Sequence, residues 1–281
     1  MSTPSESSRF QIRPLHPSHI PFARTLLTHP NIFHSPVWSV LYPTAQTAHA
    51  YAFYTACKTP ITLNTATGLS YGLFDTHYVF KNPEKELLEQ MDFPLVSIAM
   101  AHDAAEPRDN SEWVEVINVI PRLATLFGEI EKLDEREESI WKPKETGQVI
   151  YRRGTSTRAD YEGLGCAKML AHWCMGEWKR RGYRGMQLGV AHKAVERIFT
   201  VGLPEGMKGE AVARLDTEGY EEVGEDGERV KPFEKVVGDV PCVRVWVDFE
   251  WGVERGGKGG KAKKCVKRES NPPLNLGRVE S

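Results

Sequence analysis

The spacing of hydrophobic and polar positions changes several times along the chain, and each spacing predicts a different kind of element. Alternation with a period of two predicts strands, whereas apolar residues three or four positions apart predict helices. The expected strands are 10–15, 69–80, 93–103, 148–157, 183–190, 219–223 and 240–251, and the expected helices are 18–27, 44–58, 193–200 and a long one ending near 181. Ser18 is expected to cap the first helix. This order of strands and helices is typical of an α/β fold.

A further helical region interrupts the strand pattern in the middle of the chain. Residues 112–138 carry apolar side chains at helical spacing, with a break expected near Pro121. We therefore expect a helical insertion over about 104–146. The chain would then form a mixed central sheet with flanking helices, in a single domain over 9–253.

The composition is that of an ordinary soluble globular protein, with 40% hydrophobic and 26% charged residues among 281. The net charge is −2, but residues 254–281 carry eight Lys or Arg against three acids, which leaves 1–253 at −7. Phosphate backbones require a basic face, so no nucleic-acid partner is expected. The segments 1–8 and 254–281 hold few apolar side chains and are expected to be disordered, although the basic tail could also be a nuclear or anionic-surface address.

Features of secreted, membrane and metal-binding proteins are not found in the sequence. The first residues lack the basic and apolar regions of a secretory signal, and no apolar run is long enough to cross a bilayer. The five cysteines are scattered and form no C-x-x-C pair, which argues against a disulfide framework and a zinc site. We therefore expect a cytoplasmic protein with reduced thiols, without a metal and without a membrane partner.

Two glycines, Gly163 and Gly165, stand between the predicted strand 148–157 and the long helix that follows it. The first N–H groups of a helix have no partners within the helix, and glycine lets a ligand approach them closely. Anions bind at such positions. Two nucleotide fingerprints do not fit, because G-x-x-x-x-G-K-[ST] is absent and Lys168 stands where the dinucleotide motif needs its third glycine.

The segment Glu162-Gly163-Leu164-Gly165-Cys166-Ala167 resembles the acetyl-coenzyme A (acetyl-CoA) signature of the GNAT superfamily of acyltransferases. That signature is Arg or Gln, two residues, Gly, one residue, and Gly or Ala. The pair Gly182-Tyr183 resembles the entry to the family's fifth strand. Parts of the sequence, at 68–78, 94–100 and 152–163, are most similar to GNAT-like proteins of fungi.

The resemblance implies the GNAT fold and acetyl-CoA as the acyl donor. In the family, backbone N–H groups of this turn hold the coenzyme's pyrophosphate, assisted by the helix dipole. The residues expected to bind the coenzyme are therefore Glu162, Gly163, Leu164, Gly165, Cys166, Ala167 and Lys168 at the turn, and Thr155, Ser156 and Thr157 along the pantetheine arm.

Two departures from the family pattern affect the expected chemistry. Glu162 replaces Arg or Gln and would weaken pyrophosphate binding, unless it points away or Arg158 or Lys168 offsets its charge. In the family, the helix after the fifth strand commonly begins with Asn and presents, seven residues later, a Tyr that protonates the departing thiolate. Here those positions are His192 and Phe199.

His192, Asp75 and Glu196 are the candidate catalytic residues, and each also has a structural interpretation. His192 is expected to act as a general base, since imidazole exchanges protons near neutral pH, but a hydrogen-bonded structural histidine fits the sequence as well. Asp75, close to His77, could meet the incoming amine, although such residues are more often at the surface. Glu196 could equally belong to a solvated helix face.

The expected function is transfer of an acetyl group from acetyl-CoA to an amine of a small molecule, by direct attack in a ternary complex. The acidic body suits a cationic amine. Other possibilities stay open: a catalytically silent CoA-binding module, transfer to a protein amine or a hydroxyl, or a longer acyl donor.

Overall fold

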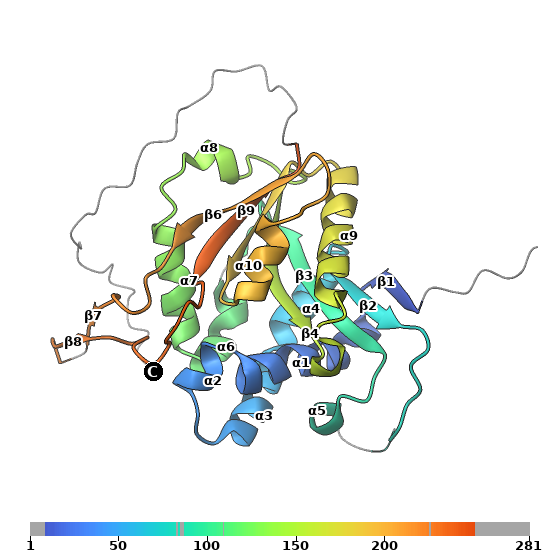
Figure 1. Ribbon diagram of the computed structural model, residues 1–281, viewed down its shortest axis with the longest axis horizontal. Coiled ribbons are helices and arrows are strands. Elements are labelled where there is room, and N and C mark those ends of the chain that lie inside the picture. The colour runs from blue at the N-terminus through green and yellow to red at the C-terminus, as the bar shows by residue number, and fades with distance from the viewer. Residues whose placement is uncertain (1–8, 83, 85–86, 109, 225, 251–281) are drawn as a thin grey trace, which may run out of the picture.

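The computed structural model describes residues 9–250 except 83, 85, 86, 109 and 225 (Figure 1). Its centre is a seven-stranded sheet in the order β1-β2-β3-β4-β5-β9-β6. The strands are β1 (Phe10–Pro14), β2 (Tyr71–Asp75), β3 (Leu95–Asp103), β4 (Val149–Thr157), β5 (Gly185–Val190), β6 (Lys208–Arg214) and β9 (Val243–Asp248). Neighbouring strands are antiparallel except β4 and β5, which are parallel, so the sheet is mixed. A separate ribbon pairs β7 (Glu222–Val223) with β8 (Arg229–Val230).

Helices cover both faces of this sheet. One face carries α9 (Cys166–Arg180) and α10 (Lys193–Thr200), which Figure 1 shows side by side in front of the strands. The other face carries α1 (Ile20–His29), α3 (Gln46–Ala56), α4 (Lys58–Ala66), α6 (Val114–Val119) and α7 (Arg122–Lys132). The chain also forms shorter helical segments, which are η1 (Pro17–His19), η2 (Pro30–His34), α2 (Trp38–Leu41), α5 (Leu87–Gln90), η3 (Asn110–Trp113), α8 (Glu138–Trp141) and η4 (Ala159–Tyr161).

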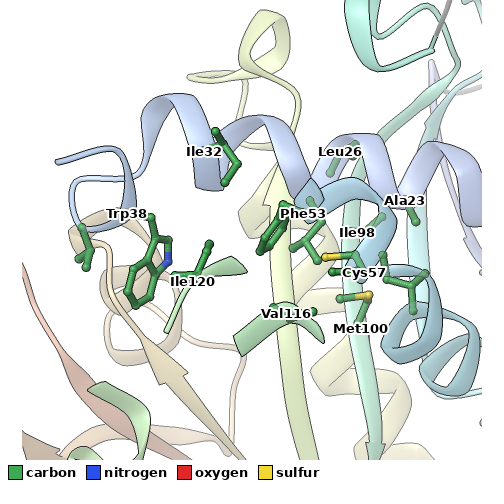
Figure 2. Packing of buried hydrophobic residues seen from close by; sticks show 14 of the residues in the cluster. Ala23, Leu26, Ile32, Trp38, Phe53, Cys57, Ile98, Met100, Val116 and Ile120 are labelled. Atoms are coloured by element: carbon green, nitrogen blue, oxygen red, sulfur yellow. The ribbon is translucent and has the colours of Figure 1, made fainter. Parts of the chain in front are cut away.

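The central strand β3 shows how the two layers are built. All nine of its residues are buried, because helices cover it from both sides. Ile98 and Met100 enter the cluster on the α1 face, where Figure 2 shows them close to Phe53. Ala99 and Ala101 face the α9 side instead, as the period of two requires.

The segment between β3 and β4 is helical, with α6 and α7 separated at Ile120 and Pro121, as the sequence predicts. Phe127 of α7 packs on β5 at Gly189, where a Cβ atom would lie 2.5 Å from the ring. Glycine at 189 therefore makes room for the insertion. Asp134, just after α7, binds Arg244 of β9 with 3.3 Å between Oδ2 and Nε. The insertion is thus fixed to the sheet by packing and by charge.

Most predicted elements are confirmed, with some corrections. The prediction that Ser18 caps the first helix is wrong: the His16 side chain caps η1, and α1 runs on to His29. The helix α4 and the strand β6 were not predicted. The expected disorder at 1–8 and 254–281 lies outside the described residues. No helix within the described part of the chain is both long and apolar enough to span a membrane.

Candidate active site

The parallel strands β4 and β5 separate part of the way along their length. They pair from Val149 with Gly185 to Arg152 with Leu188, after which β4 continues to Thr157 without β5 beside it. The pairing between β3 and β4 shifts at the same place, where Arg153 is the extra residue on β4. Such a bulge bends its strand and increases the local twist. The bend accounts for the divergence and leaves one edge of 153–157 facing a gap in the sheet.

Thr155, Ser156 and Thr157 lie on the stretch of β4 that has no β5 beside it, and their role in binding the coenzyme stays a prediction. Their other edge is bound to β3, where Ser156 pairs with Ile98. The Thr157 hydroxyl is 2.8 Å from the Ser97 hydroxyl. The Ser156 Oγ is buried and has no hydrogen-bond partner among the described residues. Backbone groups on the gap side can therefore pair with amides of a ligand.

The glycine turn follows directly and leads into α9. Gly163 and Gly165 have φ values of 77° and 75°, in the left-handed region that favours glycine. A Cβ atom at either position would meet no described atom within 4 Å, so the space beside the turn is open. Among the described residues, no side chain caps α9, and the first turn of this helix contains no acidic residue. The expected pyrophosphate residues 162–168 are thus brought together around the N-terminus of a 15-residue helix.

The exposed residues in and after the turn differ in charge, and therefore in how they would affect a bound anion. Glu162 is exposed and extended, and its N–H donates to the Ala159 carbonyl at 3.2 Å. Leu164 is exposed as well. Lys168 is exposed in the first turn of α9, and its Nζ lies near Gly202 beyond α10. Lys168 thus starts from the first turn of α9 but carries its charge towards Gly202.

Asp75 stabilises the start of this turn. Tyr161 of η4 donates its hydroxyl to Asp75 Oδ2 at 2.8 Å, and Arg9 binds the same oxygen at 2.9 Å. Burial alone would raise the pKa of Asp75, but the hydrogen bonds from Arg9, Tyr161 and the His77 N–H hold it below its usual value. The alternative interpretation, in which Asp75 is a surface residue, is wrong, because its side chain is buried. Its contacts position the turn, and its role as a catalytic residue stays a prediction.

His192 lies between β5 and α10, where it caps the helix. The Ala194 N–H donates to His192 Nδ1 at 3.2 Å, and the side chain is exposed. Because Nδ1 accepts this bond, the neutral ring carries its proton on Nε2. His192 can therefore take a proton from an amine only if the capping bond opens.

Glu196, one turn further along α10, forms an ion pair with Arg214 of β6 at 2.6 Å. That pair joins α10 to the edge strand of the sheet. A catalytic role for Glu196 stays a prediction, as it does for His192.

Arg152 was not among the residues singled out from the sequence, although the structure places it at the point where the strands separate. Its side chain is only 2% exposed, and its guanidinium lies 4.7 Å from the centre of the Phe199 ring. Burying an unpaired ion costs several kcal/mol, of which a desolvated cation–π contact returns about 2 kcal/mol. The only signal in the sequence was an arginine on the core-facing side of a predicted strand.

No protein-family model matches the sequence, and neither does any curated protein. Solved structures do match the fold. The chain is similar to the C-terminal condensation domain of Ebony in complex with beta-alanyl-dopamine, with a TM-score of 0.60 and 14% identity over 84% of this chain and 97% of that one. It is also similar to arylalkylamine N-acetyltransferase 2 from Aedes aegypti, with a TM-score of 0.58 and 12% identity over 86% of this chain and 99% of that one.

A third similar structure is the putative arylalkylamine N-acetyltransferase 7 from the yellow fever mosquito, with a TM-score of 0.53 and 10% identity over 85% of this chain and 87% of that one. At these identities the likeness concerns the fold. The mixed sheet with its flanking helices is consistent with the GNAT fold that the sequence resemblance implies.

Proposed function

We propose that the protein transfers an acetyl group from acetyl-CoA to the amine of a small molecule. The observation that carries this proposal is the gap between β4 and β5, which ends beside an open glycine turn at the N-terminus of α9. An extended ligand with an anionic group fits both features at once. The fold similarity to N-acetyltransferases supports the same reaction.

In this proposal the pyrophosphate lies against the backbone of 163–168, where unpaired N–H groups and the dipole of α9 favour negative charge. The pantetheine arm extends β4 as a short additional strand along 153–157. Both contacts are made by backbone groups. The binding site therefore needs the conformation of Gly163 and Gly165 more than any particular side chain.

The reaction is direct attack of the amine nitrogen on the thioester carbonyl carbon. Binding both reactants in one complex supplies orientation, and a β4 backbone N–H in the gap can stabilise the developing oxyanion. A base must take the amine proton. His192 is the candidate for that role, directly or through water, once its capping bond to the Ala194 N–H opens.

The acceptor is proposed to be a small amine. Two of the similar structures are arylalkylamine N-acetyltransferases, one of them putative, and the third is a complex with beta-alanyl-dopamine. The charge of −7 over residues 1–253 favours a cationic acceptor. A fungal origin and a cytoplasmic location belong to the same proposal, and they rest on the sequence resemblance and composition given above.

A catalytically silent CoA-binding module is the second candidate, and Phe199 favours it. This residue stands where the family resemblance implies a proton-donating tyrosine, and its ring is fully buried. Transfer to a protein amine or to a hydroxyl would use the same coenzyme site and would differ only in the acceptor.

Calorimetric titration with acetyl-CoA tests the proposed site. Gly165→Leu should abolish binding, because its side chain would occupy the open space beside the turn and disfavour the left-handed backbone. Gly68→Leu is the matched control, since Gly68 has a φ of 68°, is exposed and has equally open surroundings. Gly68→Leu should lower the free energy of unfolding by a similar amount and should still bind acetyl-CoA. Normal binding by Gly165→Leu would refute the site.

A thiol-release assay over a panel of amines, alcohols and peptides then separates the two candidate functions. Release with one or more small amines supports the acetyltransferase. Tight coenzyme binding without release on any acceptor favours the silent module.

A further inference from the structure

The guanidinium of Arg152 is a buried cation that has no anion beside it in the part of the chain that the structure describes. Its Nε, Nη1 and Nη2 atoms are all buried, and none has a hydrogen-bond partner among the residues that the structure describes. Buried polar groups are nearly always paired, and a buried charge more so. An unpaired buried cation in a native fold therefore calls for an explanation.

The groups packed around Arg152 do not neutralise its charge. Phe199 from α10, Leu188 of β5 and Ala101 of β3 are uncharged. On α9, the titratable side chain that interacts electrostatically with the Arg152 guanidinium is Cys174. Burial raises the pKa of the Cys174 thiol to about 12, so this thiol stays neutral at physiological pH. Burial also lowers the pKa of Arg152 to about 10, which leaves the guanidinium protonated under the same conditions.

Arg152 lies where a ligand in the gap would end. The stretch of β4 that has no β5 beside it comprises five residues, 153–157. At about 3.3 Å per residue it spans roughly 16 Å. A coenzyme bound by its pyrophosphate at the glycine turn directs its arm back along this stretch, away from Thr157. The gap closes at the pair of Arg152 with Leu188. The thiol end of the arm thus approaches the closed end, beside the guanidinium.

We infer that the Arg152 guanidinium holds the coenzyme's sulfur as a thiolate when it leaves the acetyl group. This inference rests on the proposed function and adds a catalytic residue to it. The amine nitrogen forms a bond to the carbonyl carbon, the C–S bond breaks, and its electron pair stays on sulfur. The amine proton goes to the base. Arg152 keeps its own protons throughout, and the thiolate takes a proton from solvent when the coenzyme departs.

Phe199 explains why a cation is useful at this place. Its ring can donate no proton to sulfur, and it excludes water from one side of the guanidinium. In such an apolar setting a fixed positive charge acts more strongly than in water. The guanidinium therefore substitutes electrostatic stabilisation for proton donation. The ligand-free protein retains a cation that becomes paired only when the thiolate forms.

The test measures the thiol itself, in the complex of the protein with free CoA, by the ultraviolet absorbance of the thiolate as a function of pH. In the wild-type complex the thiol pKa should lie about one to three pH units below that of the free coenzyme. Arg152→Met should return it to the free value or above, while Arg152→Lys, which keeps the charge, should retain part of the depression. Calorimetric affinity for acetyl-CoA should change little in either variant.

Arg153→Met is the matched control, because Arg153 is the adjacent arginine but contacts Trp113 and Tyr151. Trp113 belongs to the α1 side of the sheet. This variant removes the same charge and should leave the bound thiol pKa depressed. With an acceptor identified, Arg152→Met should lower kcat about 10²-fold, whereas KM for acetyl-CoA should stay nearly constant.

The outcomes separate this inference from the proposed function. A wild-type complex that binds CoA with the thiol pKa of the free coenzyme overturns the role of Arg152 and leaves the coenzyme site standing. Equal depression in wild type and Arg152→Met overturns it as well. A protein that does not bind CoA overturns both the proposed function and this inference.

Discussion

Replacing Arg152 by methionine is expected to make the ligand-free protein more stable. The wild-type side chain is 2% exposed and unpaired among the described residues, so the cost of its desolvation is not returned by an anion. Methionine fills a similar volume and can make a favourable sulfur contact with the Phe199 ring in place of the cation–π contact. Apolar replacement of buried ions raises the free energy of unfolding by about 1–4 kcal/mol in favourable cases. For a domain of this size, each kcal/mol raises Tm by about 2–4 °C.

Arg158→Met is the comparison that makes this prediction specific. Arg158 is 3% exposed, but its guanidinium donates to the Asp160 carboxylate at 2.8 Å and to the Phe93 carbonyl. Its removal should lower the free energy of unfolding by about 1–3 kcal/mol. Urea denaturation of both variants, without coenzyme, measures the two changes. The reasoning is refuted if Arg152→Met is destabilised as much as Arg158→Met, since this would mean that Arg152 has stabilising partners.

Three further predictions concern the turn and the base. Asp75→Asn should destabilise the fold by about 1–3 kcal/mol and weaken acetyl-CoA binding, because Arg9 and Tyr161 lose a charged acceptor. Because the pKa of Asp75 is lowered in the folded protein, its carboxylate stabilises the fold above the ordinary pKa of 3.8, and this stabilisation is lost as pH falls through the folded pKa. Urea titrations at several acidic pH values should therefore show a steeper loss of unfolding free energy for wild type than for Asp75→Asn. Glu162→Arg should tighten acetyl-CoA binding, more so at low ionic strength, whereas equal affinity at all salt concentrations in calorimetry would place the carboxylate away from the pyrophosphate. His192→Ala should reduce the acyl-transfer rate about 10²-fold with little change in coenzyme affinity, and full activity in this variant would assign the base elsewhere.

The elements that form the candidate site were predictable from the sequence because their signals are local. The predicted strand 148–157 is observed as Val149–Thr157, and the helix predicted at 193–200 is observed with those bounds. Glycine at a strand-to-helix junction also fixes the position of the turn, because the left-handed backbone there disfavours other residues. The strand β6 was missed, since the alternation in KGEAVAR is interrupted by charges and glycine.

The contacts that give these residues their properties could not be predicted, because they join distant parts of the chain. Asp75 is paired with Arg9 and Tyr161, which lie 66 and 86 residues away. Arg152 is buried because α10 packs Phe199 over it. A period of two can place Asp75 and Arg152 on a face of the sheet, but only the packing of other elements decides whether that face is exposed to solvent or buried.

The helical insertion makes one part of this chain replaceable. The strands β3 and β4 are antiparallel neighbours, which a turn of a few residues could join, yet the connection runs through α6, α7 and α8. Closing a longer loop costs only about 0.6 kcal/mol for each doubling of its length. Evolution can therefore lengthen, shorten or exchange this connection without changing the strand order. Any such exchange also has to supply a new cover for Gly189, and this makes Phe127 and Gly189 a pair of positions that must change together.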